Sequence, residues 1–481
     1  MTTKEHGIYC ISRDVSLSVE TPIHRLYNSG GDDRMMSYDV LILGCGPAGY
    51  YAALGCARAG FRTAVVEKGE LGGTGFRWGC LPVKMMLDEL RSRQGRNPRG
   101  AAHPSAASRL FGRRLLARTS AAMVGVERRM AQELERHGVQ LIHGEGEFID
   151  AHTIRAGGAL FPASTIVIAT GTGPWAPAGV ILNGDTVASH ADLVTWRAAP
   201  TTAVIVGADV EGIELACLLA HLGTQVELIE VKGEILPGMD RDLVKPVEER
   251  LRALGTRMRL SAEVVHVHSE RGGAAVLLAD GSTTRAGKVL VTGVRRPNFP
   301  AGLVGAGIVH TADRIGVDDR FRTSVHHIYA IGDINGLCGM AHAAIQQGIL
   351  LARIIRGGQP GPAAWPSLPR ALFTIPEIAG AGSQARDLEQ QGIPYTRATF
   401  ALADTWRGIS RNFHEGFVTV LAAKDRKLLG LWVCGQGASE LAAPFGPLLD
   451  RGAAVDDLLE SLFIHPTLSE GLLEAAWRLA T

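Results

Sequence analysis

The sequence of 481 residues lacks paired cysteines, long apolar runs and an excess of either charge. Its seven cysteines stand singly with no C-x-x-C pair, so we expect mostly reduced thiols in a cytoplasmic protein. No segment has the roughly 18 apolar residues of a membrane helix, and the N-terminus has no secretory signal pattern. The formal net charge of +1 gives no reason to expect nucleic acid or an acidic membrane as partner.

The length predicts about three domains, because one hydrophobic core does not grow to this size. Glycine is abundant, with 59 residues, well above the usual share of about 7%. Many glycines follow predicted strands, which is typical of phosphate-binding turns. Residues 1–35 show little periodicity, and we interpret them as a flexible extension or as sequence upstream of a start near Met35 or Met36.

One arrangement of strand, glycine turn, helix and strand occurs twice. The apolar run 39–43 precedes a helical stretch at 47–59 and a second strand at 61–67. The run 202–206 begins the second copy, whose last strand ends at Glu230. The repeat predicts two dinucleotide-binding units.

Other segments have their own patterns. Apolar residues at helical spacing predict a long amphipathic helix over 106–136. The basic segment 91–105 is rich in Pro and Gly and predicts a solvated loop. Strand-like runs at 416–422 and 427–434, followed by helices, indicate an α+β terminal domain.

The first glycine turn has each part that a dinucleotide site needs. Gly44 permits the tight turn, Gly46 lets the backbone approach a pyrophosphate, and Gly49 allows close packing of helix and strand. The helix N-terminus attracts the phosphates, and Glu67 can accept a hydrogen bond from ribose hydroxyls.

The second glycine turn departs from this pattern at Asp209, in the place of the second glycine. A carboxylate there would repel a pyrophosphate by on the order of several kcal/mol at an effective dielectric constant near 20. Glu211 adds a second acid. Glu230 favours a free ribose 2′-hydroxyl, and hence NAD over NADP. We therefore predict weakened NAD(H) binding, or a fold that persists without its ligand.

The segment 72–84 reads GGTGFRWGCLPVK. It resembles the redox-active segment of the class I pyridine nucleotide–disulfide oxidoreductases, closest to dihydrolipoamide dehydrogenase, which reads G-G-T-C-x-x-x-G-C-x-P-S-K. Cys80 matches the second cysteine of that pair, and Gly75 stands where the first would be. The resemblance covers about residue 38 to the end of the chain.

The resemblance implies an α/β fold with two Rossmann-like domains, for FAD and NAD, and a C-terminal α+β dimerisation domain. The expected boundaries are an extension at 1–35, FAD-binding parts at 36–183 and 310–365, an NAD(P)-binding domain at 184–309 and a dimerisation domain at 366–481.

The motifs also imply the cofactor-binding residues. Residues 169–171 resemble the turn by which such flavoproteins cross between domains, and Asp333 matches the aspartate that binds the ribityl chain of FAD. The expected FAD-binding residues are Gly44, Gly46, Pro47, Ala48, Gly49, Glu67, Lys68, Gly72, Gly73, Thr74, Gly79, Lys84, Gly146, Ala169, Thr170, Gly171, Gly332, Asp333, Met340, Ala341 and His342. Those expected to bind NAD are Gly207, Gly212, Glu214 and Glu230.

Four residues are catalytic candidates. Cys80 lies near a helix N-terminus, which should lower the pKa of its thiol, and the family pairs the counterpart of Lys84 with a carboxylate near the flavin. His465 and Glu470 match the family's H-P-T-L-S-E motif, in which the histidine is the general base for the partner subunit and the glutamate orients it. The dyad implies a homodimer.

These observations leave three functions open. In the first, an FAD enzyme moves electrons between NAD(P)H and a thiol, disulfide or related acceptor, which uses the space vacated at Gly75 and reacts with Cys80 alone. The second is a flavin-dependent reductase of quinones or other non-disulfide acceptors. The third is a catalytically impaired flavoprotein paralogue with a binding role. The substrate cannot be read from the sequence.

Overall fold

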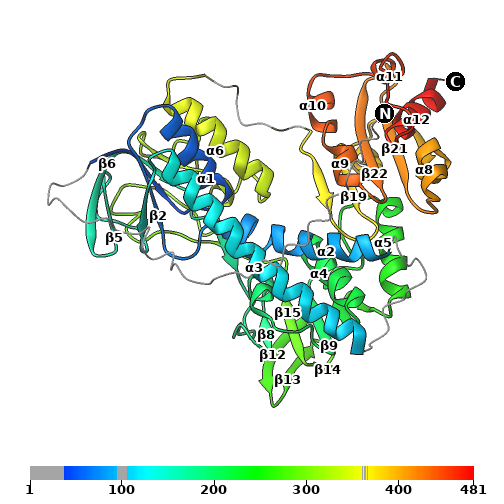
Figure 1. Cartoon of the computed structure of the whole chain (residues 1–481), viewed down its shortest axis with the longest axis horizontal. Coiled ribbons are helices and arrows are strands. Elements are labelled where there is room, and N and C mark those ends of the chain that lie inside the picture. Colours follow the sequence, from blue (N-terminus) through cyan, green and yellow to red (C-terminus); the bar gives the residue numbers. More distant parts are fainter. Residues whose placement is uncertain (1–36, 95–105, 360, 362–364, 366, 481) are drawn as a thin grey trace, which may run out of the picture.

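The computed structural model describes residues 37–94, 106–359, 361, 365 and 367–480 (Figure 1). The predicted extension at 1–35 lies outside the described residues. The predicted loop at 91–105 is wrong at its start, because residues 91–94 continue helix α2 (Cys80–Gln94). The remainder of that segment lies outside the described part.

The first unit is built on a seven-stranded sheet. Strands β3, β2, β1, β6 and β17 pair in parallel, and β4, β5 and the start of β6 form an antiparallel extension. Parallel neighbours need crossovers, and helix α1 supplies the first, beginning at Pro47, a residue suited to the first helical position. The elements are β1 (Tyr38–Leu43), α1 (Pro47–Arg58), β2 (Thr63–Glu67), α2, α3 (Ala106–Arg136), β3 (Gln140–His143), β4 (Glu147–Phe148), β5 (Thr153–Ala156), β6 (Ala159–Ile168), β17 (Ile328–Ala330) and α6 (Ala341–Ile355).

The second unit repeats the first around a parallel sheet ordered β11-β10-β9-β15-β8. Here β9, α4 and β10 correspond to β1, α1 and β2, which confirms the repeat. A three-stranded antiparallel sheet and the short pair β7–β16 complete it. The elements are β7 (Thr172–Pro174), β8 (Val187–Ala188), a 3-10 turn (His190–Thr195), β9 (Thr202–Val206), α4 (Val210–His221), β10 (Gln225–Ile229), α5 (Arg241–Ala253), β11 (Arg257–Arg259), β12 (Val264–Glu270), β13 (Gly273–Leu278), β14 (Thr283–Ala286), β15 (Lys288–Val291) and β16 (Arg295–Pro297).

The C-terminal unit is an antiparallel sheet ordered β18-β19-β22-β21-β20 with helices packed on it. Figure 1 shows this sheet and α12 at the upper right, apart from α1 and α6, which lie side by side at the left. The elements are β18 (Arg370–Leu372), β19 (Ile378–Gly382), α7 (Ala385–Gln391), β20 (Thr396–Ala401), α8 (Trp406–Arg411), β21 (Phe417–Ala422), β22 (Leu428–Cys434), α9 (Ala438–Ala442), α10 (Phe445–Asp450), α11 (Val455–Leu459) and α12 (Glu470–Ala480). This arrangement confirms the predicted α+β region.

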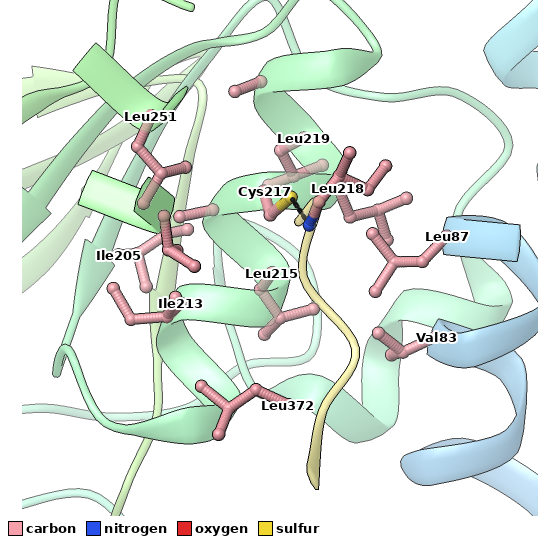
Figure 2. Packing of buried hydrophobic residues seen from close by; sticks show 14 of the residues in the cluster. Val83, Leu87, Ile205, Ile213, Leu215, Cys217, Leu218, Leu219, Leu251 and Leu372 are labelled. Carbon is pink, nitrogen blue, oxygen red and sulfur yellow. Dashed lines mark hydrogen bonds between the residues drawn. The ribbon is translucent and has the colours of Figure 1, made fainter. Parts of the chain in front are cut away.

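One apolar cluster joins the three units. Figure 2 shows α4 in its centre, with Val83 and Leu87 of α2 on one side and Leu372 of β18 on another. The backbone amide of Ile375 donates to the sulfur of Cys217 at 3.3 Å. Each fully buried leucine contributes about 1.5–3 kcal/mol, so this cluster fixes α2 against the second unit. None of the helices in the described residues has the length and apolar character needed to cross a membrane.

Candidate functional site

A cavity of about 560 Å³ opens where β1, β6 and β17 end. Its volume falls within the roughly 300–1,000 Å³ of ligand and cofactor sites. The predicted residues that line it are Gly44, Gly46, Pro47, Ala48, Glu67, Lys68, Gly73, Thr74, Gly146, Ala169, Thr170, Gly171, Gly332, Asp333 and Ala341. Cys80 also lines it. Residues from five separate stretches of the chain thus surround one space.

Six other predicted residues support the cavity or lie beside it. The glycines among them leave room for close packing, since a Cβ at Gly79 would lie 2.7 Å from the Thr74 carbonyl oxygen. Met340 is the N-cap of α6, and His342 is exposed on its first turn. The six are Gly49, Gly72, Gly79, Lys84, Met340 and His342.

The first glycine turn has the conformation that an anion site requires. Gly44 has a φ of +95°, and a Cβ on Gly49 would overlap the Gly44 carbonyl oxygen. At Gly46 the nearest atom to an added Cβ would be 4.0 Å away. The turn is therefore tight where helix meets strand and open toward the cavity, where the N-terminus of α1 attracts phosphate.

Glu67 fixes this turn through both carboxylate oxygens. The backbone amide of Cys45 donates to Oε2 at 2.8 Å, and that of Gly69 donates to Oε1 at 3.0 Å. A carboxylate has about four acceptor positions, so lone pairs remain for ribose hydroxyls.

The far end of the cavity offers polar groups of the kind that FAD needs. The Thr170 hydroxyl is buried and has no hydrogen-bond partner in the structure. The Thr172 hydroxyl donates to Asp333 Oδ2 at 3.1 Å. Burial raises the pKa of Asp333, against the opposing influence of Arg295 and Thr172. An unpartnered hydroxyl, a half-buried carboxyl and an open helix N-terminus fit a dinucleotide with a polar chain.

Gly75 lines the cavity, but its Cβ position is not vacant. It lies in a π-helical turn (Thr74–Trp78), and its φ is not in the left-handed region. A Cβ there would lie nearer than 3.0 Å to Pro47 Cγ, and 3.5 Å from the Ala341 Cβ. The expectation of a space vacated for substrate sulfur is therefore wrong at the Cβ position, because the Pro47 ring fills it.

The environment of Cys80 also differs from the sequence-based expectation. Burial raises the pKa of the Cys80 thiol, and Glu214 adds to the increase, while Lys84 and Arg295 oppose it. The predicted decrease is wrong, because the cost of desolvation outweighs the nearby cations.

Lys84 and Glu214 form a buried ion pair between α2 and α4. Burial opposes the charge on Lys84, but Glu214 outweighs it and raises the pKa of the ammonium. Glu214 also accepts from the Phe373 amide at 2.9 Å. Both of its oxygens are thus engaged with protein groups, and its predicted contact with NAD stays a prediction.

The second glycine turn repeats the first with one carboxylate added. Gly207 has a φ of +102°, and a Cβ on Gly212 would overlap the Gly207 carbonyl oxygen. Glu230 accepts from the amides of Ala208 at 2.6 Å and Lys232 at 2.9 Å, as Glu67 does in the first unit.

Asp209 is the N-cap of α4 and lies exposed at the mouth of that turn. Its Oδ1 accepts from the Val210 amide at 2.8 Å. The side chain therefore supplies the negative charge that a pyrophosphate would bring to this helix N-terminus and uses one of its donors.

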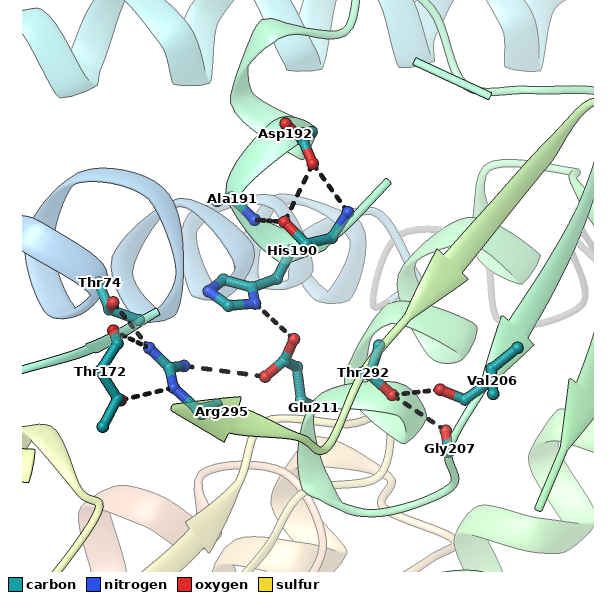
Figure 3. Close-up of polar contacts among 11 residues, drawn as sticks. Thr74, Thr172, His190, Ala191, Asp192, Val206, Gly207, Glu211, Thr292 and Arg295 are labelled. Carbon is teal, nitrogen blue, oxygen red and sulfur yellow. Dashed lines mark hydrogen bonds and ion pairs between the residues drawn. The ribbon is translucent and has the colours of Figure 1, made fainter. Parts of the chain in front are cut away.

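Glu211 lies between the imidazole of His190 and the guanidinium of Arg295 (Figure 3). Its Oε1 is 2.6 Å from Nδ1 of the buried His190, and its Oε2 is 3.9 Å from Arg295 Nη1. Arg295 also donates to the hydroxyls of Thr74 at 2.8 Å and Thr172 at 3.0 Å. Sequence reasoning missed this network, since its five members come from five separate segments.

His465 and Glu470 form a pair on the C-terminal unit. His465 Nδ1 lies 2.8 Å from Glu470 Oε1, and the Thr467 amide donates to Oε2 at 2.8 Å. Burial favours the neutral acid, but these hydrogen bonds outweigh it and lower the pKa of Glu470. The His465 side chain is 63% exposed. Large apolar side chains close to it in sequence or in space are also exposed: Trp406, Ile409, Leu462 and Ile464.

Comparison with known families defines the class of protein. Residues 38–348 match the pyridine nucleotide-disulphide oxidoreductase model, and residues 368–476 match the dimerisation domain of the same family. The chain belongs to the pyridine nucleotide-disulphide oxidoreductase family. Membership supports an oxidoreductase with FAD and a pyridine nucleotide as cofactors, and the dimerisation domain supports a homodimer.

Individual relatives are similar along nearly the whole chain. A protein named soluble pyridine nucleotide transhydrogenase, from Mycobacterium tuberculosis, is 33% identical over 456 residues, covering 92% of this chain and 97% of the relative. A dihydrolipoyl dehydrogenase from Pseudomonas aeruginosa is 30% identical over 462 residues, covering 92% and 98%.

Solved structures agree with this fold. The crystal structure of LpdA from Mycobacterium tuberculosis has a TM-score of 0.84 at 27% identity, covering 92% of this chain and 99% of that one. The flavoprotein disulfide reductase RclA from Escherichia coli has a TM-score of 0.82 at 23% identity, with coverage of 92% and 99%, and shows the fold alone.

Proposed function

We propose that this protein is an FAD-dependent oxidoreductase that takes electrons from a pyridine nucleotide and passes them to an acceptor. The enzyme uses no internal dithiol in this transfer. FAD supplies reversible acceptance and release of a hydride equivalent. In our proposal the acceptor is a second pyridine nucleotide: the donor NAD(P)H loses a hydride and becomes NAD(P)⁺, and the acceptor NAD(P)⁺ gains one. The name of the mycobacterial relative, a soluble pyridine nucleotide transhydrogenase, supports this acceptor.

The observation that carries the proposal is the geometry at Gly75. A dithiol mechanism needs two thiols that can form a disulfide beside the flavin. Here residue 75 is glycine, so Cys80 has no thiol at the usual partner position, and a Cβ there would also overlap Pro47. The raised pKa of Cys80 also reduces the thiolate available for attack on a substrate disulfide. Hydride transfer between nucleotides requires neither thiol.

The residues around the cavity have separate roles in this proposal. The amides at the start of α1 bind the pyrophosphate of FAD, Glu67 accepts from its ribose and Asp333 holds its ribityl chain. The second unit binds first the donor nucleotide and then the acceptor nucleotide. Asp209 weakens this binding, which suits an enzyme in which one nucleotide must leave before the other binds. His465 of one subunit reaches the partner's site in the homodimer.

The test is anaerobic reduction of the purified flavoprotein by NADH and then by NADPH, followed by reoxidation with a thionicotinamide analogue of NAD⁺. The wild-type protein and Cys80→Ser should both show flavin bleaching and recovery at similar rates. Cys434→Ser, which changes a fully buried thiol remote from the cavity lining, is the control. Loss of reoxidation in Cys80→Ser alone would refute a thiol-independent reaction.

A second candidate uses Cys80 directly, since its side chain lines the cavity. A substrate disulfide would then form a mixed disulfide with Cys80, releasing one thiol, and two electrons from the reduced cofactor would release the other. This version predicts NADH-driven lipoamide turnover that Cys80→Ser abolishes. Quinone turnover that survives Cys80→Ser would instead favour a non-disulfide acceptor other than a nucleotide.

A further inference from the structure

The network of Glu211, His190 and Arg295 is not needed by the reaction proposed above. Glu211 lies in the first turn of α4, and Arg295, on β16 of the same unit, lines the cavity of the first unit. The contact between them is an ion pair at 3.9 Å. It lies at the edge of the cavity, where Arg295 also contacts Thr74 of the first unit.

Arg295 is held in one orientation by groups that belong to the cavity. Its Nη2 donates to the Thr74 hydroxyl and its Nε to the Thr172 hydroxyl. The Thr172 hydroxyl in turn donates a hydrogen bond to Asp333 Oδ2. The guanidinium thus lies among three residues of the cavity wall, and its charge acts on both Cys80 and Asp333.

Glu211 and His190 are arranged to control that charge. His190 is 3% exposed, its Nε2 has no partner in the structure, and its ring packs near Gly79. Its Nδ1 faces Glu211 at 2.6 Å. The Glu211 carboxylate contacts both the His190 imidazole and the Arg295 guanidinium. Its interaction with His190 therefore affects how much of the Arg295 charge it neutralises.

We propose that Glu211 is a positioning residue that sets the reduction potential of the flavin by partly neutralising Arg295. The inference rests on the FAD site of the proposed function and on no particular acceptor. The reduced cofactor carries more negative charge than the oxidised one when its proton uptake is incomplete. A fully effective Arg295 therefore favours the reduced form, and Glu211 limits that preference.

The test is potentiometric titration of Glu211→Gln, with chemical reduction and a reference dye in place of NADH. Loss of the carboxylate charge should raise the ratio of reduced to oxidised flavin at a fixed potential by on the order of tenfold, about 30 mV for a two-electron couple. Glu211→Asp keeps the charge and should stay within about twofold of wild type.

Glu227→Gln is the matched control, because Glu227 pairs with Arg259 at 2.6 Å in the same unit but neither residue lines the cavity. An unchanged potential in Glu211→Gln, or an equal shift in Glu227→Gln, would overturn the inference. His190→Leu should act in the opposite direction, because Glu211 then faces no imidazole and its carboxylate offsets Arg295 more fully. A rise of the reduction potential both in Glu211→Gln and in the His190 variant would indicate general disruption and would also overturn the inference.

This experiment separates the two proposals. A protein purified without flavin would contradict the proposed function. A flavoprotein that NADH fails to reduce would contradict its nucleotide chemistry, while the dye titration would still measure the effect of Glu211.

Discussion

Replacing Gly75 with alanine tests whether Pro47 fills the space beside it. The new Cβ would lie nearer than 3.0 Å to Pro47 Cγ and 3.3 Å from Pro47 Cδ. Pro47 is the first residue of α1, so apart from a change of ring pucker its position is tied to that helix. Pro47, the residue nearest to the new Cβ, is therefore part of the glycine turn that lines the cavity.

Two opposing effects set the magnitude. Overpacking of a well-filled site costs about 1–3 kcal/mol. Alanine recovers about 0.4–1 kcal/mol through the unfolded state, because the φ of Gly75 is one that alanine adopts. The net loss of stability for Gly75→Ala should be about 0.5–2 kcal/mol. In Gly75→Ala/Pro47→Ala the clash is removed, so the two changes should couple favourably by about 1 kcal/mol.

The assay is thermal release of flavin from the holoprotein, used to rank variants because a chain of several units need not unfold in two states. Gly125→Ala is the matched control, since Gly125 lies exposed in α3 with no atom within 4 Å of an added Cβ. That variant should release flavin at the wild-type temperature or above it. A Gly75→Ala protein as stable as Gly125→Ala, with no coupling to Pro47→Ala, would refute the reasoning.

Three other predictions follow from contacts described above. Lys84→Met should destabilise the protein by about 3–5 kcal/mol in urea, because it leaves the buried Glu214 charge uncompensated, while Lys84→Met/Glu214→Leu should recover most of that loss. Asp209→Gly should lower the Kd for NADH by about tenfold in a flavin-reduction titration, which corresponds to about 1.4 kcal/mol; an unchanged Kd, with Asp209→Asn also unchanged, would show that the carboxylate does not hinder binding. The lowered folded-state pKa of Glu470 means that its stabilising effect is full above the ordinary carboxyl range, near pH 4.3, and is lost as pH falls through the folded value. The difference in urea midpoint between wild type and Glu470→Gln should therefore shrink on acidification, and a constant difference from pH 7 to pH 3 would contradict it.

Much of the fold could be predicted because its signals are local. The helix predicted over 106–136 is α3 (Ala106–Arg136), and the runs predicted at 416–422 and 427–434 are β21 and β22 within one residue. Apolar periodicity and glycine turns are fixed by the chain itself, so one sequence is enough to find them.

The site was less predictable where its properties depend on contacts between distant segments. The ring of Pro47 beside Gly75 joins two turns 28 residues apart in sequence. Burial of Cys80 near the Glu214 carboxylate reverses the effect expected from its own helix. The ion pair of Glu211 with His190 depends on a 3-10 turn (His190–Thr195) that sequence reasoning did not single out. Sequence spacing identified the participants of the cavity, and tertiary packing set their charge states. The predicted domain boundaries and catalytic roles stay predictions.

The paired backbone contacts of Glu67 and Glu230 have a consequence for how such a protein changes over evolution. Each carboxylate ties its glycine turn to the end of the neighbouring strand with two amide hydrogen bonds that do not involve a nucleotide. The shape of each unit is thus maintained separately from its occupancy. An acidic residue such as Asp209 can weaken nucleotide binding without disrupting the fold of the unit that would bind the nucleotide. The hydrogen bonds that shape the second glycine turn therefore do not depend on a bound nucleotide.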